Sequence, residues 1–335
     1  MRLVLPLIAA AVLLAPLPAA AGAADKEALR ASIGRAMSVL DKQQPKFERQ
    51  ATCASCHNQI SPMIAASVIR TKGLPINDAV YTKQVAMSAE VIRRRHDYSL
   101  VHGVSGGEHA VTSPTLTGLA EIKFPADENT DVAVVYLLAK QSADGSWPGV
   151  ATRLPHGDSN FDQTATAVRA IDAYAPPALR KQADAAITKA RAWLIATPAR
   201  VNNEALTYRL LALVWANAPR AEIAKARTQL VASQQGDGGF AQQTGMASDA
   251  YATGQALVSL HRSGMRATDT VYRNGLDYLL RKQKPDGSWF VQTHAMPLQP
   301  PIDSGFPGGP SQWISAWATA YAAEAMAYGL KGPRP

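Results

Sequence analysis

The segment Gln141-Ser142-Ala143-Asp144-Gly145-Ser146-Trp147 decides the fold, because two further copies of it follow along the chain. The copies are Gln234-Gln235-Gly236-Asp237-Gly238-Gly239-Phe240 and Gln283-Lys284-Pro285-Asp286-Gly287-Ser288-Trp289. All three place a glutamine, an Asp-Gly pair and an aromatic residue at the same offsets. Self-similarity of this kind is the signature of a repeat architecture.

Each copy joins two segments whose apolar residues recur with the period of a helix. Leu276, Leu279 and Leu280, for example, precede Gln283. The Asp-Gly pair reverses the chain because glycine tolerates a positive φ, and the glutamine at the end of the first helix can bond exposed carbonyl groups. An aromatic ring can then cover this polar patch. The repeated unit is therefore a helix, an Asp-Gly turn, a loop and a second helix.

Weaker copies extend the pattern to six pairs of helices. The second helices are rich in small residues, as in segments 251–256 and 316–320, which suits an inner ring with little room. We therefore predict an all-α fold of about six helix pairs, an α/α toroid in which one ring of helices encloses another. The alternative, an open superhelical solenoid, would carry polar capping units that the sequence lacks. Equivalent points lie 50, 47, 57, 36 and 49 residues apart, at Gln44, Arg94, Gln141, Pro198, Gln234 and Gln283.

The three repeats resemble those of the terpenoid cyclase and protein prenyltransferase superfamily, which includes the squalene-hopene cyclases. The resemblance covers most of residues 30–330 and implies an α/α toroid. The chain resembles more closely a group of exported bacterial proteins that join a Cys-x-x-Cys-His motif to these repeats. The segments that carry this second resemblance are residues 53–62, 247–254 and 304–315.

The composition argues against a nucleic-acid partner. The 335 residues include 34 Lys and Arg against 26 Asp and Glu, a formal net charge of +8, yet only 18% of residues are charged. No basic block exceeds Arg93-Arg94-Arg95. Nucleic-acid binding through counterion release needs clustered cations, so we expect no such partner.

The first 23 residues have the form of a secretory signal peptide. A positive start is followed by an apolar run over residues 3–17 and by small residues at 21–23. The run is shorter than the roughly 20 apolar residues that span a bilayer, and two prolines interrupt it. We predict cleavage near Ala23 and a single toroid domain over residues 24–335 with no stable membrane span. In a Gram-negative source the mature protein would be periplasmic.

The only two cysteines belong to the motif Cys53-Ala54-Ser55-Cys56-His57. Two thiols at this spacing can add to both vinyl groups of haem, and His57 is then placed as an axial iron ligand. We predict covalent haem c anchored by Cys53 and Cys56 in the first repeat. A disulfide or thiol redox pair is one alternative, favoured by an oxidising compartment, and a metal site such as zinc is another.

The second axial ligand of such a haem is less constrained. In a closed ring the first unit touches the second and the sixth, which nominates His102, His109, His294 or Met296. A five-coordinate iron is the alternative, and it would suit small-molecule binding or peroxide chemistry rather than electron transfer.

Polar residues are expected at the starts of the second helices. If the ring closes, these starts converge around one mouth, where the partial positive charge of helix N-termini suits acidic caps or bound anions. Asp162 and Asp249 also have ordinary N-cap sequences, so capping is the alternative role. The expected starts lie near Cys56, Ser113, Asp162, Glu204, Asp249 and Ser315.

Asp162 has a second possible role. The segment Asn160-Phe161-Asp162-Gln163-Thr164-Ala165 resembles the Asp-x-Asp-Asp-Thr-Ala motif of squalene-hopene-type cyclases. The middle aspartate of that motif protonates an alkene, and the resemblance implies Asp162 as the corresponding general acid. Asn160 and Gln163 replace the two flanking acids, although protonation of an alkene needs an unusually strong acid.

Together these patterns favour an exported haem c protein with a redox or haem-linked sensing role. Its partners would be a periplasmic redox protein and an apolar small molecule in the central cavity. Two other functions stay open. One is a squalene-hopene cyclase-like isomerase that uses Asp162, and the other is a non-enzymatic lipid- or peptide-binding module with a Cys53–Cys56 disulfide.

Overall fold

The computed structural model describes residues 25–50, 55–101, 109–150, 154–157, 159–199, 202–296, 300 and 302–332. These residues form thirteen α-helices and two short turns of other helix types, and among them β-pairing is limited to two isolated bridges. The predicted all-α class is therefore confirmed. The expected signal peptide and Cys53 lie outside the described residues.

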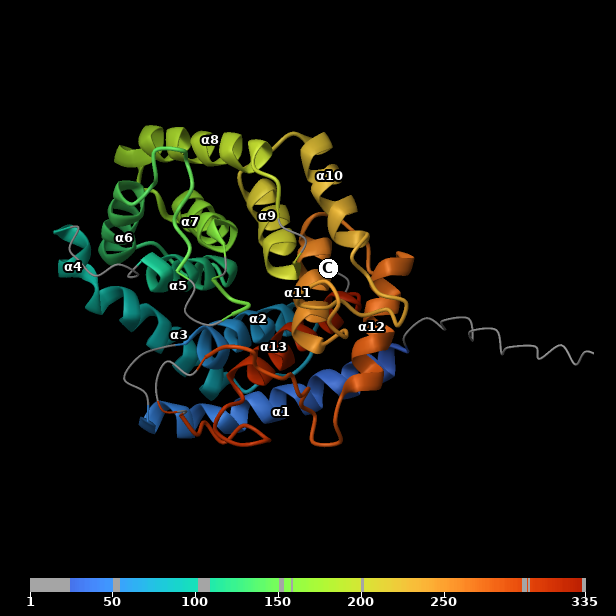
Figure 1. Ribbon diagram of the computed structural model, residues 1–335. Helices are drawn as coiled ribbons and strands as arrows, with labels where there is room; N and C mark the ends of the chain where they lie inside the picture. Colours follow the sequence, from blue (N-terminus) through green and yellow to red (C-terminus); the bar gives the residue numbers. More distant parts are fainter. Residues whose placement is uncertain are drawn as a thin grey trace, which may run out of the picture.

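The helices alternate between an outer and an inner ring along the chain (Figure 1). The outer helices are α1 (Lys26–Gln50), α3 (Asp78–Arg94), α6 (Glu128–Ala139), α8 (Arg180–Ala196), α10 (Arg220–Val231) and α12 (Thr270–Lys282). The inner helices are α2 (Ser61–Thr71), α5 (His109–Glu121), α7 (Asn160–Tyr174), α9 (Asn203–Trp215), α11 (Ala250–Arg262) and α13 (Trp313–Tyr328). The short elements are the π-helical turn η1 (Cys56–Ile60), α4 (His96–Leu100) and the 3₁₀ turn η2 (Pro177–Leu179).

The two rings are closed. The inner helices pack in the order α2, α5, α7, α9, α11 and α13, and α13 packs back against α2. The outer ring closes where Gln283, just after α12, donates a 3.0 Å hydrogen bond from Nε2 to the carbonyl of Ser32 in α1. The six predicted helix pairs thus form a closed toroid, which excludes the open solenoid.

The three Asp-Gly turns share one set of contacts. In each, the glutamine Nε2 donates to the turn glycine carbonyl at 2.9–3.0 Å and to a carbonyl of the following outer helix at 2.8–3.0 Å. The turn glycine has a positive φ of +88° to +99°. The aromatic residue is buried, and its backbone N–H donates to a threonine of the next inner helix. The predicted glutamine bonds are confirmed, and they link successive outer helices.

The small residues of the inner helices allow a close approach, as the sequence predicted. A Cβ added at Gly254 of α11 would lie 2.8 Å from the Cβ of Tyr321 in α13. Helix α13 is buried along most of its length, which is why its sequence shows no polar face.

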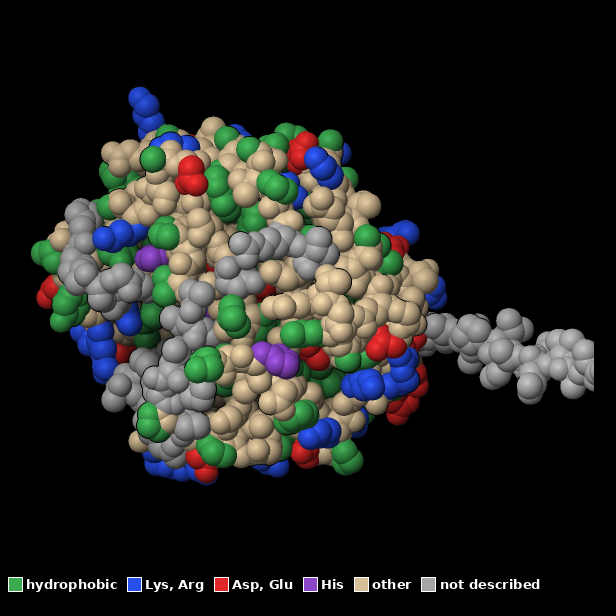
Figure 2. All heavy atoms as spheres, viewed as in Figure 1, with side chains coloured by type: hydrophobic (Ala, Val, Ile, Leu, Met, Phe, Trp, Pro, Cys, Tyr) green, Lys and Arg blue, Asp and Glu red, His purple; other side chains and the backbone are tan. Residues whose placement is uncertain are grey.

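The outer surface carries dispersed charge. On the face in Figure 2, Lys and Arg side chains are spread around the periphery with Asp and Glu between them. No helix in the described part of the chain has both the length and the apolar character needed to cross a membrane.

Candidate functional site

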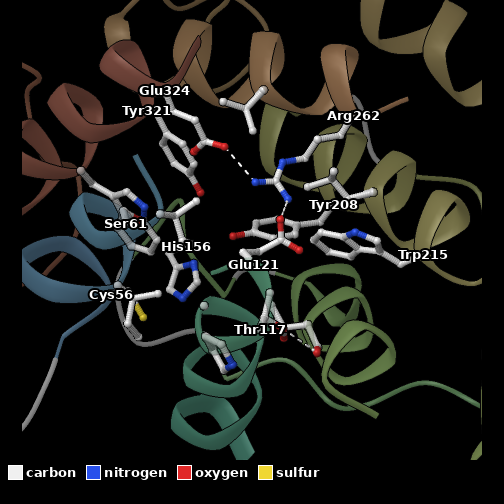
Figure 3. Close-up of a pocket in the computed structure, with 18 residues that line it drawn as sticks. Cys56, Ser61, Thr117, Glu121, His156, Tyr208, Trp215, Arg262, Tyr321 and Glu324 are labelled. Carbon is white, nitrogen blue, oxygen red and sulfur yellow. Dashed lines mark hydrogen bonds and ion pairs between the residues drawn. The ribbon is translucent and has the colours of Figure 1, made fainter. Parts of the chain in front are cut away.

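A central cavity of about 620 Å³, counting the part open to solvent, lies between the inner helices (Figure 3). Every inner helix contributes to its wall, and most of the lining side chains are apolar or aromatic. Four aromatic residues surround it: Tyr208, Trp215, Trp317 and Tyr321. The remaining lining residues are Cys56, Ile60, Ser61, Ile64, Pro114, Thr117, Gly118, Glu121, His156, Leu211, Thr166, Val258, Arg262 and Glu324.

The described half of the cysteine motif lies at this cavity. Cys56 opens η1 and lines the wall, and Ser55 caps the turn by accepting a hydrogen bond from the Asn58 backbone N–H at 3.1 Å. Such π-turns are rare and occur frequently at functional sites. The ring of His57 lies 6.1–6.4 Å, between centroids, from the rings of Phe47, Trp313 and Trp317.

These residues fit one edge of a covalently attached haem. The thiol of Cys56 is on the wall of an apolar cavity, and the adjacent imidazole stands among aromatic rings that can pack against a porphyrin.

Three of the four nominated second ligands are in the described part of the chain, and none of the three lines the cavity. His109 is buried at the start of α5, where Nε2 lies 2.8 Å from the Pro148 carbonyl. His294 and Met296 are exposed, Met296 by 81%. His102 lies outside the described residues, so the identity of a second ligand stays a prediction.

The histidine that does line the cavity is His156, which the sequence analysis did not select. Its Nδ1 lies 3.3 Å from Oε1 of Glu204, and its ring centroid lies 4.8 Å from that of Trp317. Glu204 is buried, and its Oε2 accepts hydrogen bonds from Tyr251 Oη at 3.1 Å and Gln255 Nε2 at 2.9 Å. Glu204 is thereby fixed in place and orients the imidazole.

Asp162 lies in the first turn of α7 and is 1% exposed. The capping role is wrong for this residue, because Ser159 is the N-cap, but it is confirmed for Asp249, which accepts from the Ala252 backbone N–H at 2.9 Å. Asp162 Oδ2 accepts from Gln163 Nε2 at 3.1 Å, while Oδ1 has no hydrogen-bond partner among the described residues.

Burial raises the pKa of Asp162 to about 6, with His156 lowering it and Glu204 raising it further. A buried carboxyl of this kind is neutral under mildly acidic conditions and can donate a proton. Asp162 stands one helical turn before Thr166, whose side chain lines the cavity and whose Oγ1 donates to the Asp162 carbonyl. Asp162 is therefore on the same face of α7 as a residue that lines the cavity, although it is not itself among the lining residues.

Asn160 and Gln163, which replace the two flanking acids of the cyclase motif, form hydrogen bonds with other residues of the protein. Asn160 Oδ1 accepts from the Gly149 backbone N–H at 2.8 Å, and Gln163 Oε1 accepts from Ser113 Oγ at 3.2 Å. Of the six expected helix starts, Glu204 contacts His156, and the charges of both act on Asp162. Ser315 instead donates to and accepts from Val291 in the preceding loop.

Charged residues close the cavity at the C-terminal ends of the inner helices. Arg262 of α11 forms ion pairs with Glu121 of α5, on the opposite side of the inner ring, and with Glu324 of α13 at 2.8 Å (Figure 3). Arg169 of α7 holds the other oxygen of Glu121 at 2.7 Å. Burial alone would raise the pKa of Glu121, but Arg262 and Arg169 lower it below its ordinary value. No sequence motif marked this network.

Comparison with known proteins supports the fold. No family model and no curated protein matches the chain. The solved structure of the type II terpene cyclase MstE from Scytonema matches with a TM-score of 0.57 and 14% identity over 90% of this chain and 98% of that one. An MstE variant with its product merosterolic acid A matches with a TM-score of 0.59 and 15% identity, over 90% and 97% of the two chains.

A glycosidase variant in complex with glucose is similar to the same degree. Its TM-score is 0.59 at 14% identity, over 91% of this chain and 98% of that one. Proteins with different activities therefore share this toroid, and at such identity the likeness concerns the fold alone.

Proposed function

We propose that the protein is a cyclase-type enzyme that binds an apolar, isoprenoid-like substrate in the central cavity, with Asp162 as the general acid. One observation carries the proposal. Asp162 is a buried carboxyl one helical turn before the cavity-lining Thr166, one of its oxygens has no partner among the described residues, and burial raises its pKa to about 6. These are the properties of a proton donor rather than of a structural carboxylate.

The cavity wall supports the same chemistry. Protonation of an apolar substrate creates positive charge on carbon, and the faces of Tyr208, Trp215, Trp317 and Tyr321 can stabilise it. In addition, a variant of the type II terpene cyclase MstE, which has a similar fold, has been solved in complex with its product, merosterolic acid A.

The groups around Asp162 would support proton transfer in both directions. After donation, the Asp162 carboxylate keeps the hydrogen bond from Gln163 Nε2. It is also attracted to His156, which lowers the pKa of Asp162. Glu204 holds the imidazole in place for this role.

The test is turnover of polyprenyl substrates, followed by mass spectrometry of the products. Asp162→Asn should lower the rate roughly 10²- to 10⁴-fold, the usual contribution of a positioned general acid. Asp172→Asn is the matched control, because Asp172 lies on the same helix with half of its side chain exposed. Equal turnover by both variants would refute the role of Asp162.

A second function, haem c attachment at Cys53, Cys56 and His57, is favoured by the position of Cys56 on the cavity wall. A bound haem would supply redox chemistry in the exported protein and would call for a periplasmic redox partner. The residues of this chain would hold it through two thioethers and the His57 imidazole. The haem would then lie at the same cavity in which we propose that the apolar substrate binds.

This second proposal is tested by expression in a host with a cytochrome c maturation system. The exported protein should show a Soret band and the covalent mass of haem, and Cys56→Ala should lose both. Colourless protein of unmodified mass would refute attachment. If that protein gains two hydrogens on reduction, it carries the Cys53–Cys56 disulfide instead.

A further inference from the structure

Within the described part of the chain, one imidazole lies on the wall of the central cavity, that of His156. It belongs to the loop between α6 and α7 rather than to a helix, so contacts of its side chain fix its place on the wall. A cyclase reaction needs more than an acid, because the cation formed by protonation must lose a proton or add water before a neutral product can leave.

The partner of His156 has the contacts of a carboxylate. Glu204 Oε2 accepts from Tyr251 Oη at 3.1 Å and from Gln255 Nε2 at 2.9 Å, and its Oε1 lies 3.3 Å from His156 Nδ1. Gln255 is fixed in turn by Asn203 Nδ2, which donates to its Oε1 at 2.7 Å. Glu204 is therefore a positioning residue, held by two side chains of α11.

This contact sets which nitrogen of the ring carries the proton. A carboxylate only accepts hydrogen bonds, so His156 Nδ1 is the donor to Glu204 and Nε2 of the neutral ring has the lone pair. The carboxylate also stabilises the imidazolium that forms when Nε2 takes a proton, the same division of roles as in a catalytic triad.

The imidazole lies against the aromatic part of the cavity wall. Its ring centroid is 4.8 Å from that of Trp317, and Trp317 stacks on Tyr321 at 6.1 Å between centroids and 15° between planes. All three side chains line the cavity. Since a cation is stabilised over an aromatic face, a carbocation held at Trp317 would lie on the same part of the wall as His156.

The carboxylates that line the cavity are less suited to take a proton. Glu121 and Glu324 both form ion pairs with Arg262. Although burial would raise the pKa of Glu121, Arg262 and Arg169 hold it below its ordinary value, which makes this carboxylate a weaker base.

We propose that His156 is the general base of the site and takes a proton from the carbon next to the cationic centre, so that the product is a cyclic alkene. This inference rests on the proposed cyclase function and names the class of its product. The electron pair of the C–H bond becomes the second bond of the alkene, and the proton goes to His156 Nε2. Asp162 has lost one proton and His156 has gained one, so the product is an isomer of the substrate, and exchange with water restores both groups.

The test incubates the protein with farnesol and geranylgeraniol and identifies the products by mass spectrometry. The wild type should release a cyclic isomer of the probe. His156→Gln should lower the rate of isomer formation roughly 10²-fold or more, the contribution of a positioned base. Water then captures the cation, and a product heavier by one water should become the major one.

His96→Gln is the matched control. His96 Nδ1 also lies beside a carboxylate, 2.9 Å from Asp97 Oδ1, and its side chain is 24% exposed against 18% for His156. His96 is not among the residues that line the cavity, so this variant should form the wild-type products.

His156→Ala with added small molecules separates a base from a space-filling ring. Imidazole should raise the rate of isomer formation by this variant, whereas pyrazole, a ring of the same size and a far weaker base, should not. Equal restoration by both rings would overturn the inference.

The inference also fails if the wild type itself releases mainly the hydrated product, or if His156→Gln forms the isomer at the wild-type rate. The cyclase function stands in both of these cases. If the wild type leaves both probes unchanged, the proposed function fails and the role of His156 fails with it.

Discussion

The Asp-Gly turns and the starts of the inner helices are both rich in polar residues, but they use them differently. In the three turns, the glutamine side chain, the aspartate carboxylate and the backbone N–H of the aromatic residue each form an equivalent hydrogen bond. At the inner-helix starts the polar residues vary in type and in partners, and Asp162 and Asn203 keep unpaired buried atoms within the described chain. Polar groups that are repeated and satisfied serve the fold, while groups that are singular and unsatisfied point to a ligand.

The largest effect should come from breaking a turn. Gly287 has a φ of +94°, and a Cβ there would lie 2.6 Å from the Arg35 carbonyl oxygen in α1. We expect Gly287→Ala to lower the free energy of unfolding by about 3–4 kcal/mol, through backbone strain and the clash at the ring closure. Urea unfolding of the variant and the wild type measures this change in the free energy of unfolding.

Gly236→Ala is the control, in another copy of the turn. A Cβ at Gly236 meets no atom within 4 Å, so this variant should stay within about 1 kcal/mol of the wild type or gain stability. Equal losses in the two variants would mean that the turn contacts do not hold the ring.

A slightly smaller effect on stability, a gain instead of a loss, is expected from substitution of Asp162 at the start of α7. The pKa of Asp162 rises from 3.8 to about 6 on folding. Between these values the folded protein holds a proton that the unfolded chain has released, so stability falls as the pH rises. The Asp162→Asn variant lacks this pH-dependent loss. Its free energy of unfolding should therefore rise by about 3 kcal/mol relative to that of the wild type as the pH increases from about 3.5 to 7.

Unfolding of both proteins across this pH range provides the measurement. Asp41, whose pKa burial also raises to about 6, contributes equally to both and cancels in the difference. A difference that does not change with pH would show that Asp162 is not a buried, unsatisfied acid.

The smallest effect tests whether the turns are equivalent. Gln141→Ala removes two hydrogen bonds to carbonyls and should cost about 1 kcal/mol. Gln283→Ala should cost somewhat more, because Gln283 Oε1 also accepts from Ser32 Oγ at 2.8 Å. Thermal unfolding of the pair resolves the difference, and a Gln141→Ala variant that is the less stable of the two would contradict this ranking.

The same contrast explains what the sequence could predict. The turn is local, since Gln, Asp-Gly and the aromatic residue lie within seven positions, and so the repeat and the toroid were predictable. The site is not local. His156 and Glu204 are 48 positions apart, and Arg262 and Glu121 are 141 apart, distances for which no spacing rule exists.

The acid role of Asp162 was predicted only through resemblance to a cyclase motif, and its capping role was wrong because Ser159 is the N-cap of α7. The unpaired state of its Oδ1 depends on which side chains surround it after folding. No pattern of neighbouring residues contains that information.

The bond from Gln283 to Ser32 joins the sixth helix pair to the first, and this has a consequence for how the molecule comes apart. A linear array of repeats frays from its terminal units, which have a neighbour on one side only. Here every pair has two neighbours, so there is no weak end at which melting can start. We expect heat to disrupt the whole circle in one cooperative event, and loss of α1 to loosen α12 and α13 as much as α2.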